Sequence, residues 1–593
     1  VLDNVLYGNP ARCHSPEGWP SFKGWPDHAS LTHEQSYYRW VERAYMAGLR
    51  VFVNLFVENK VLCEAYPLKK NSCNEMNSVR LQNRDIDALQ DYIDAQHGGP
   101  GRGWFRLVTT PEQARRVIAQ GKMAVIKGIE VSEPFDCAVY NDQPKCDRKQ
   151  IDRELAEVYG FGVRQMELIN KFDNALAGVA GDSGETGVVV NNGNKLETGK
   201  YWQMQACNGP PDEDDKQQIG VYNHDEHDIG SNLIENYLPL GAAPVYPANS
   251  NCNARGLTDL GEYAVRQLIK RHMILDPDHL SVRARKSLMS IAEADRYSGV
   301  VSSHSWSTPD VESRIYKLGG VITPMQGEAP GWVKHWRELR RKRDKRFLYA
   351  VGYGADENGF ATQLGPRSGS SVKYPFKSFD GGVTFQRQPS GSHLFDFNKN
   401  GVAEYGQFAD WYNDLSHVGG KALVRDMANG AEAYLETWER ATGIGFGCKS
   451  GRQHFTRVGL GRMRLRYSPS RLLRRAGQPK TRGNRAWTWC VTRKKNKHRK
   501  LVAALDRKGK VQLIGSNAIG HRVLRIRPGV KSKRLKGKAR RIGRGLYVRR
   551  AGKRARFFYV VRKGRVRVVG VATRGATKSG KKLRAYLKLA KLR

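Results

Sequence analysis

The sequence of 593 residues predicts an α/β fold: a (β/α)8 TIM-type barrel with its first strand missing, followed by a smaller basic α+β domain. Three observations lead to this prediction. Continuous apolar segments alternate with helical periodicity over residues 1–447, polar residues follow the carboxyl ends of these segments, and the charge changes abruptly over residues 448–593. A hydrophobic content of 39% excludes wholesale disorder, and no apolar run reaches the roughly 18 residues that cross a bilayer.

Seven strands are expected in the first domain. They lie at residues 51–57, 123–130, 163–170, 272–278, 298–304, 319–325 and 347–356. Each follows a helical stretch or a loop, and continuous apolar strands between helices are typical of a parallel sheet covered on both faces. A domain of this length exceeds a typical barrel but fits one with inserted loops. The count is one strand short of the eight that close a barrel.

Helix boundaries are readable in front of the first two strands. Residues 31–48 have helical spacing and lead into the first strand. Before the second strand, Thr110 is expected to be the N-cap, with Pro111 at the first helical position and Gln113 completing the capping signal. Gly121 is expected to stop this helix.

Nine cysteines bear on the cellular compartment, and none forms a CxxC motif, which leaves zinc ribbons and thioredoxin-like motifs without support. The close pairs Cys63/Cys73 and Cys137/Cys146 lie in polar loops, which favours short disulfides in an oxidising compartment over free thiols in a reducing cytosol. Further pairs are plausible between Cys207 and Cys252 and between Cys448 and Cys490, with Cys13 left over. The sequence thus predicts a secreted or cell-surface bacterial protein.

Polar side chains stand at the ends of the predicted strands, where barrel enzymes carry their chemistry. They are Glu130, Asn170, Asp278 with His279, His304 and Asp356. Singly, each could be an ordinary polar loop residue. Together, two imidazoles and two carboxylates from Glu130, His279, His304 and Asp356 would converge at one barrel mouth, a donor set suited to zinc and possible for manganese, iron or cobalt.

Residues 256–306, from GLTDLGEY to SHSW, resemble the membrane (renal) dipeptidase family of the metal-dependent amidohydrolase superfamily. The resemblance extends to AVIKGIE, ending at Glu130, and to YAVGYGADENG, which contains Asp356. It implies that Glu130 bridges two zinc ions, that His279 and His304 are metal ligands, and that Asp356 handles the proton of the attacking water. It also implies hydrolysis of an amide or peptide bond in a small-molecule or peptide substrate.

Two departures from the family pattern matter. No HxD pair, which would supply two ligands to one metal, precedes the helix at residues 31–48. With the strand count, this predicts an N-terminally truncated sequence, whose two-zinc site depends on the missing HxD; the alternative is a degenerate barrel that cannot hold the first metal. Asn170 stands where a dipeptidase has a substrate-contacting His, which puts dipeptide specificity in doubt. Arg314 stands where the family has an arginine that contacts substrate carboxylate, although a solvated helix charge is an equal alternative.

Two further segments contain residue types that bind ligands in other proteins. The run DFNKNG at residues 396–401 copies the start of a calcium loop, but Gln407 occupies the position that needs Glu, so a turn is the better interpretation. The polar cluster at residues 224–228 could line the barrel mouth, although a solvated loop is the better interpretation.

The tail is the source of the +43 net charge. From residue 449 onward there are 49 Lys and Arg and one acid, Asp506, so the tail carries +48 and the rest of the chain −5. DRKGKVQLIG at residues 506–515 recurs as VRKGRVRVVG at residues 561–570, which predicts a folded domain with two internal repeats. Such charge binds polyanions. Anionic cell-wall polymer or a membrane surface is the expected partner, and nucleic acid is the second choice.

These observations predict a secreted metal-dependent hydrolase held at an anionic surface by its basic tail. The alternative is a non-catalytic barrel that serves as a scaffold or binding protein, with a polyanion- or nucleic-acid-binding C-terminal domain.

Overall fold

The computed structural model describes residues 18–21, 25–29, 36–66, 69–182, 184–210, 213–215, 244, 246, 250–305, 309–357, 362–367, 369, 372–492 and 498–592. Cys13 and the polar cluster at residues 224–228 lie outside these ranges. The chain divides into two compact units, Val1–Ala441 (unit 1) and Thr442–Arg593 (unit 2). Within the described ranges, no helix has the length and apolar character needed to cross a membrane.

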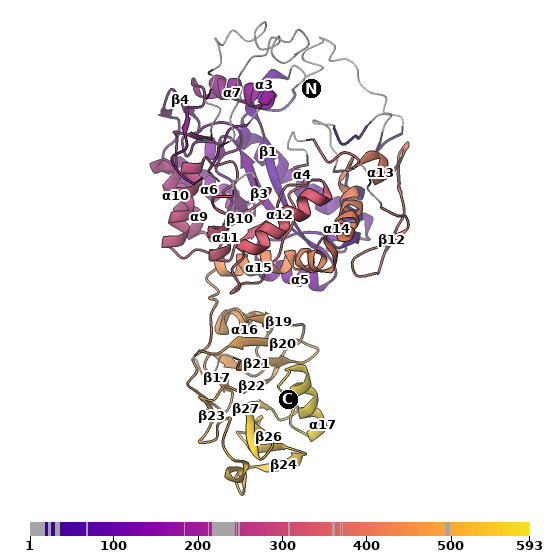
Figure 1. Ribbon diagram of the computed structural model, residues 1–593, viewed down its shortest axis with the longest axis vertical. Helices are drawn as coiled ribbons and strands as arrows, with labels where there is room; N and C mark the ends of the chain where they lie inside the picture. The colour runs from indigo at the N-terminus through magenta and orange to yellow at the C-terminus, as the bar shows by residue number, and fades with distance from the viewer. Residues whose placement is uncertain are drawn as a thin grey trace. The chain divides into compact units, whose positions relative to one another are not determined.

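Unit 1 is a mixed α/β structure organised on parallel strands (Figure 1). Its main sheet has the order β1 (Val51–Glu58), β3 (Met123–Val131), β6 (Val163–Met166) and β9 (Ile274–Leu275), with β2 (Phe105–Leu107) beside the start of β3. All of these pairings are parallel. A parallel bridge from Leu275 to Val300 continues the ladder to β10 (Val301–Ser302) and β11 (Val321–Ile322), and a second bridge joins Met325 to Gly354.

The seven predicted strand regions therefore follow one another in one parallel ladder. The prediction was too long for most of them, because regular pairing covers only two residues in each of β9, β10 and β11. It was wrong for residues 347–356, which make the single bridge at Gly354 and form no strand. A Cβ at Gly354 would lie 2.5 Å from the Cβ of His304, so the close approach of the two segments requires glycine.

The helices of unit 1 surround these strands. They are α2 (Tyr38–Ala47), α3 (Lys60–Ala65), α4 (Glu75–Gln96), α5 (Pro111–Ala119), α6 (Arg148–Gly160), α7 (Gly184–Thr198), α9 (Asp259–Lys270), α10 (Val282–Ala294), α11 (Glu312–Leu318), α12 (Ala329–Lys342), α13 (Phe397–Asn400), α14 (Phe408–Ala428) and α15 (Gly430–Ala441). The cap at α5 is as predicted: the Thr110 side chain accepts a hydrogen bond from the Gln113 backbone N–H at 3.2 Å. Two-stranded ribbons lie in the connections: β4 (Val139–Tyr140) with β5 (Gln143–Pro144), β7 (Met204–Ala206) with β8 (Asn251–Asn253), β12 (Phe376–Lys377) with β13 (Thr384–Phe385), and β14 (Gln388–Ser390) with β15 (His393–Phe395).

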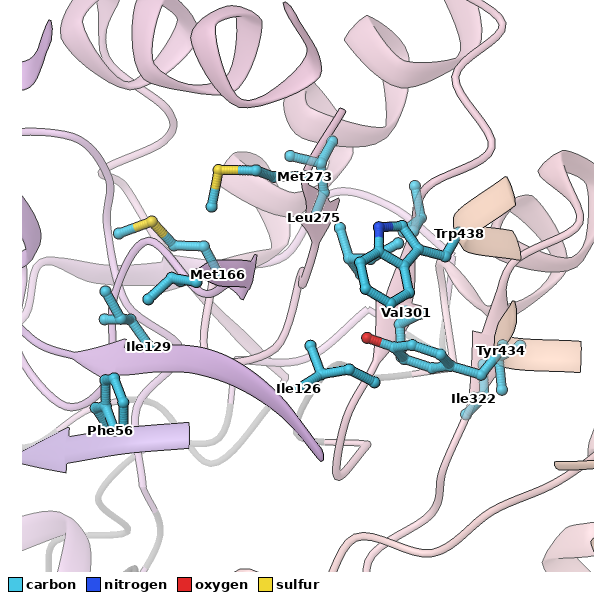
Figure 2. Close-up of a cluster of buried hydrophobic side chains, with 14 of the residues drawn as sticks. Phe56, Ile126, Ile129, Met166, Met273, Leu275, Val301, Ile322, Tyr434 and Trp438 are labelled. Atoms are coloured by element: carbon cyan, nitrogen blue, oxygen red, sulfur yellow. The ribbon is translucent and has the colours of Figure 1, made fainter. Parts of the chain in front are cut away.

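The core of unit 1 lies around the parallel strands (Figure 2). All nine residues of β3 are buried, as expected for a strand covered on both faces. Ile126 and Ile129 of β3, Met166 of β6 and Leu275 of β9 belong to one apolar cluster with Trp438 of α15. This packing fixes the positions of the strand ends, where the polar side chains lie.

A cavity of about 620 Å³ lies between the first and the last segments of the ladder. Residues of β1 line it, as do residues 351–357 together with Glu130 and His304. One edge of β1 pairs with β3, and no other described strand pairs with β1. The cavity therefore reaches from the unpaired edge of β1 to the carboxyl ends of β3 and β10.

Unit 2 is built on an antiparallel sheet of eight strands with the order β19-β20-β21-β22-β27-β26-β25-β24. Their bounds are β19 (Thr481–Arg482), β20 (Ala486–Cys490), β21 (Lys500–Leu505), β22 (Val511–Ser516), β24 (Arg540–Gly543), β25 (Leu546–Arg550), β26 (Ala555–Arg562) and β27 (Arg565–Thr573). A second sheet contains β16 (Gln453–Phe455), β17 (Gly459–Leu460), β18 (Met463–Arg464) and β23 (His521–Val523), and the helices are α16 (Pro469–Ala476) and α17 (Gly580–Leu589), with a short 3-10 turn at Ser532–Leu535.

The two similar tail segments form adjacent hairpins in the large sheet. Residues 506–515 include the turn between β21 and β22, and residues 561–570 include the turn between β26 and β27. Strands β22 and β27 pair directly, with Gly515 opposite Gly570, the last residue of each segment.

Four disulfides are present among the residues that the structure describes. They join Cys63 to Cys73, Cys137 to Cys146, Cys207 to Cys252 and Cys448 to Cys490, the pairs that the sequence predicted. Disulfides on this scale are consistent with an extracellular protein.

Candidate metal centre

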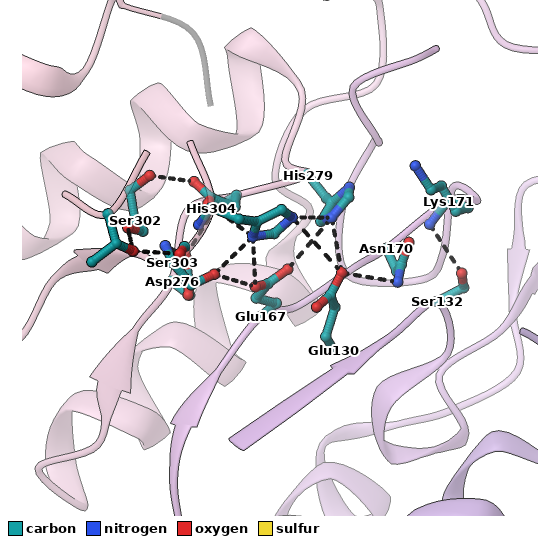
Figure 3. Close-up of polar contacts among 12 residues, drawn as sticks. Glu130, Ser132, Glu167, Asn170, Lys171, Asp276, His279, Ser302, Ser303 and His304 are labelled. Atoms are coloured by element: carbon teal, nitrogen blue, oxygen red, sulfur yellow. Dashed lines mark hydrogen bonds and ion pairs between the residues drawn. The ribbon is translucent and has the colours of Figure 1, made fainter. Parts of the chain in front are cut away.

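Three of the predicted ligands converge at the carboxyl ends of three strands of the parallel ladder (Figure 3). Glu130 is the second-to-last residue of β3. His279 lies four residues beyond the end of β9, and His304 lies two residues beyond the end of β10. Parallel strands end at the same edge of a sheet, so side chains far apart in sequence meet there. The three residues are buried.

The two imidazoles and the Glu130 carboxylate are in direct contact. His279 Nε2 lies 3.0 Å from Glu130 Oε1 and 2.9 Å from His304 Nε2. His304 Nε2 lies 3.9 Å from the same carboxylate oxygen. Nitrogen lone pairs and a carboxylate oxygen therefore point at one small volume, which is the arrangement that a metal ion requires.

Glu167 is a fourth member of this group that the sequence analysis missed. It directly follows β6, its side chain is fully buried, and its Oε2 lies 3.9 Å from His279 Nε2. One ligand atom from each of Glu130, Glu167, His279 and His304 can be chosen so that all four lie within 4.8 Å of one another. Glu167 Oε2 has no hydrogen-bond donor among the residues that the structure describes. The available signal was a carboxylate inside the apolar run QMELI, since a buried charge needs a partner.

A second layer of polar groups orients His304. Asp278 Oδ2 lies 3.2 Å from His304 Nδ1 and accepts a hydrogen bond from the His304 backbone N–H at 2.8 Å. Ser302 Oγ donates to the other Asp278 oxygen at 2.7 Å. Fixing Nδ1 in this way directs Nε2 toward Glu130 and His279, as partners of metal-binding histidines do.

The electrostatics of the site favour a cation. Burial raises the pKa of Glu130 and raises that of Glu167 well above its usual range, and neighbouring carboxylates add to the rise at Glu167. Burial lowers the pKa of His304, but Glu130 and Asp278 outweigh it and raise the value to about 10. The carboxylates around the site carry more negative charge than two imidazoles can balance. A divalent ion would neutralise the excess. The donor set and its charge therefore fit a metal such as zinc.

Asp356 lies beside this group but outside it. Its side chain lines the cavity together with Glu130 and His304. Burial raises its pKa, His304 opposes the rise and Glu130 adds to it, giving a value of about 7. Its backbone has φ of 47°, a left-handed conformation that is uncommon for an aspartate. A carboxyl group that titrates near neutrality can both accept and release a proton.

Asn170 also reaches the site. Its Nδ2 donates a hydrogen bond to Glu130 Oε1 at 3.1 Å, so it holds the oxygen that faces His279. The next residue, Lys171, lies 3.3 Å from Asp182. The structure thus brings Asn170 together with the predicted metal ligands.

The structure does not bring Arg314 to the site. Its guanidinium pairs with Glu293 of α10 at 2.9 Å and donates to Ser290 of the same helix, and Arg314 does not line the cavity. This placement matches the alternative of a helix-surface charge. The segment at residues 396–401 likewise forms α13 with Asp396 as its N-cap, and Asp396 pairs with Arg387 at 2.6 Å, so the interpretation as a turn fits better than a calcium loop.

No family model and no curated protein matches the sequence. Solved structures that align with it include a dipeptidase described as a metallopeptidase of family M19, at 12% identity and a TM-score of 0.39 over 74% of this chain and 96% of that one. An amidohydrolase from Pseudomonas aeruginosa aligns at 12% identity and 0.37, over 70% and 98%. A metallopeptidase from Rhodobacter sphaeroides, bound to a phosphinate mimic of the dipeptide L-Ala-D-Ala, aligns at 12% and 0.36, over 68% and 89%. At these values, the functional argument rests on the side chains of the site.

Proposed function

We propose that the protein is a metal-dependent hydrolase whose site is the group Glu130, Glu167, His279 and His304. The observation that carries the proposal is the convergence of two imidazoles and two carboxylates within 4.8 Å at a buried point. Zinc is the first candidate for the ion, because two nitrogen and two oxygen donors suit it. A divalent ion bound there supplies a Lewis acid and lowers the pKa of water toward neutrality.

The protein's own residues have separate roles in this proposal. His279 and His304 present Nε2, Asp278 holds His304 through Nδ1, and Asn170 holds Glu130. Asp356 takes a proton from the attacking water on its carboxylate and gives it to the leaving amine, since its pKa of about 7 suits both transfers. The reaction would be hydrolysis of an amide or peptide bond.

The cavity is compatible with a small-molecule or peptide substrate. Its volume of about 620 Å³ falls in the range of small-ligand pockets, and it reaches Glu130, His304 and Asp356. The same space lies along the edge of β1 that no described strand covers. We also propose that unit 1 is a (β/α)8 barrel in which an eighth strand pairs with this edge, and the expectation of a second zinc ion depends on ligands from such a strand.

Secretion and attachment are the remaining parts of the proposal. The four disulfides support an oxidising compartment. The +48 charge of the tail supports binding to anionic wall polymers or a membrane surface. A non-catalytic scaffold is the competing function, and it predicts neither bound metal nor hydrolysis.

The test is metal content and hydrolysis measured on the same preparation of the full chain. We expect at least one bound divalent ion per chain by elemental analysis, and hydrolysis of members of an amide and dipeptide panel that a chelator abolishes and added zinc restores. Glu167→Gln should lower both readouts, whereas Glu293→Gln, which removes a carboxylate on α10, should change neither. Less than one ion per chain without hydrolysis would favour the scaffold.

A further inference from the structure

Five cationic side chains gather around one concavity at an end of the large sheet in unit 2. They are Arg466, Lys510, Lys553, Arg554 and Arg574, and we name the concavity that they line the basic pocket. Its volume is about 540 Å³. None of the five forms an ion pair with a carboxylate of the described residues, and Asp506 is the single acid from residue 449 onward.

The fold brings these charges together through adjacent antiparallel strands. Lys510 directly precedes β22, Arg554 directly precedes β26, and Arg574 directly follows β27, which lies between those two strands. The start of an antiparallel strand lies beside the end of its neighbour, so all three residues lie at one end of the sheet. The charges therefore meet because of the topology and not because the chain is basic everywhere.

The backbone under the pocket is fixed by hydrogen bonds. The Arg574 N–H donates to the Arg554 carbonyl at 3.0 Å, and the Arg466 N–H donates to the Val511 carbonyl at 2.7 Å. Arg466 adopts φ of 67°, a left-handed conformation that costs energy for a non-glycine residue. These contacts fix the backbone from which the side chains of Arg466, Arg554 and Arg574 extend to line the same space.

The floor of the pocket is polar and also ordered. Thr573 Oγ1 donates to Gln512 Oε1 at 2.6 Å, and Gln512 Nε2 donates to Asp506 Oδ2 at 2.7 Å. Asp506 also accepts from the Lys508 and Lys510 backbone N–H groups at 2.9 and 2.8 Å. The only acid of the tail is thus engaged in holding the floor and does not pair with the surrounding cations.

We propose that the basic pocket binds two or more adjacent phosphate groups of an anionic phosphate polymer. This inference rests on the polyanion-binding part of the proposed function and gives it a defined site. Like charges separated by about 4 Å repel by about 1 kcal/mol in water, and a multivalent oxyanion removes that repulsion while accepting hydrogen bonds from guanidinium groups.

The shape and lining of the pocket distinguish among polyanions. A concavity admits a chain segment with its phosphates more readily than it fits a flat membrane surface. No residue that lines it is aromatic, so it has no platform on which nucleic-acid bases could stack. The charges themselves are the recognition element, and arginine forks favour phosphate geometry.

The experiment compares two triple variants of the full chain that lose the same charge. The pocket variant is Lys510→Gln, Arg554→Gln and Arg574→Gln. The control variant is Arg527→Gln, Lys533→Gln and Arg534→Gln, and these three residues are exposed. Their segment lies beside the start of β27, because the Gly529 N–H donates to the Val566 carbonyl and the backbones of Lys531 and Arg565 form a β-bridge. Thr573, at the other end of β27, lies about 26 Å from that start at about 3.3 Å per residue.

Binding of inorganic polyphosphate is measured by titration at several salt concentrations. We expect the pocket variant to lose about tenfold or more in affinity near 0.15 M salt. The slope of log affinity against log salt should become less negative by about 3. The control variant should lose much less. Tripolyphosphate should raise the Tm of the unmodified chain and of the control variant but not that of the pocket variant, a readout that also reveals any failure of folding.

Each alternative outcome overturns the proposal in a recognisable way. Equal losses in both variants would mean delocalised binding, which removes the site but leaves polyanion attachment standing. No binding by the unmodified chain at low salt would remove both. Tighter binding of single-stranded DNA than of polyphosphate, or of anionic vesicles with no effect of the pocket variant, would assign the charge to a different partner.

Discussion

The Nε2 atoms of His279 and His304 lie 2.9 Å apart, although the two residues follow different strands. Two protonated imidazoles cannot share such a contact, so one nitrogen must present its lone pair to the other. A metal ion would need the lone pairs of both nitrogens, so metal binding at this site should release protons and weaken as the pH falls.

The first prediction concerns the ligands. His279→Ala and His304→Ala should each lose most bound metal, because each removes a nitrogen donor that no neighbouring side chain replaces in the cluster. Elemental analysis of the purified variants measures this directly. His417→Ala, which removes an exposed histidine on α14, is the matched control and should retain full metal content. Retention of metal by both ligand variants would show that the ion binds elsewhere.

The second prediction separates proton transfer from metal binding. Asp356→Asn should lower turnover by about 10² to 10⁴ and leave metal content nearly unchanged, because Asp356 lies outside the four-residue cluster and acts through its proton. Turnover and metal content are measured on one sample. A loss of metal equal to that of His304→Ala would make Asp356 a principal ligand.

The third prediction concerns stability and pH. Burial raises the pKa of Glu133 from 4.5 to about 9, and the nearby carboxylates of Glu197 and Glu75 add to the rise. The charge of Lys60, whose Nζ lies 3.6 Å from Glu133 Oε2, opposes it. The folded state then holds a proton that the unfolded state has released. The contribution of this bound proton to the free energy of unfolding is complete below about pH 4.5. It is lost as the pH rises toward about 9.

Glu133→Gln should remove this dependence, so that the stability of the variant relative to the unmodified protein rises between pH 5 and 9, by at most about 1.4 kcal/mol per pH unit. Thermal melts across this range measure the change. Glu338→Gln, an exposed carboxylate on α12, should leave the profile unaltered. Parallel profiles for Glu133→Gln and the unmodified protein would contradict the assigned pKa.

The fourth prediction ranks the disulfides. In the chain-entropy model, a bond stabilises a protein more when it closes a longer loop. Cys448–Cys490 spans 42 residues and Cys63–Cys73 spans 10, which corresponds to about 4 and about 2.7 kcal/mol. Replacing Cys448 and Cys490 by serine should therefore lower the melting temperature of unit 2 by more than replacing Cys63 and Cys73 by serine lowers that of unit 1. The reverse order would indicate that native-state contacts around the short loop dominate.

The sequence predicted the strands whose residues are continuously apolar and missed features that depend on spatial neighbours. β1 and β3 appear as predicted, because VFVNLFV and MAVIKGIE have few polar interruptions. Residues 347–356 looked equally strand-like, but they contact the ladder only at Gly354, where the backbone packs against His304. Periodicity does not report such close approaches.

The candidate site shows the same division. Glu130, His279 and His304 could be found from their positions at strand ends, because that rule depends on order along the chain. The position of Glu167 inside an apolar run indicates burial, but its part in the site follows only from its distance to His279. The opposite holds for Arg314, whose ion pair with Glu293 has no signature in the spacing of residues.

The edge of β1 that faces the cavity has a consequence for handling the protein. VFVNLFV combines high β-propensity with no proline and no charge before Glu58, which is the composition of segments that stack into intermolecular sheets. Backbone groups along an unpaired edge are open to strands from other molecules. Where the proposed eighth strand does not cover this edge, concentrated preparations should therefore aggregate through β1, and a charged substitution at Asn54, in the middle of that strand, should delay the onset of turbidity.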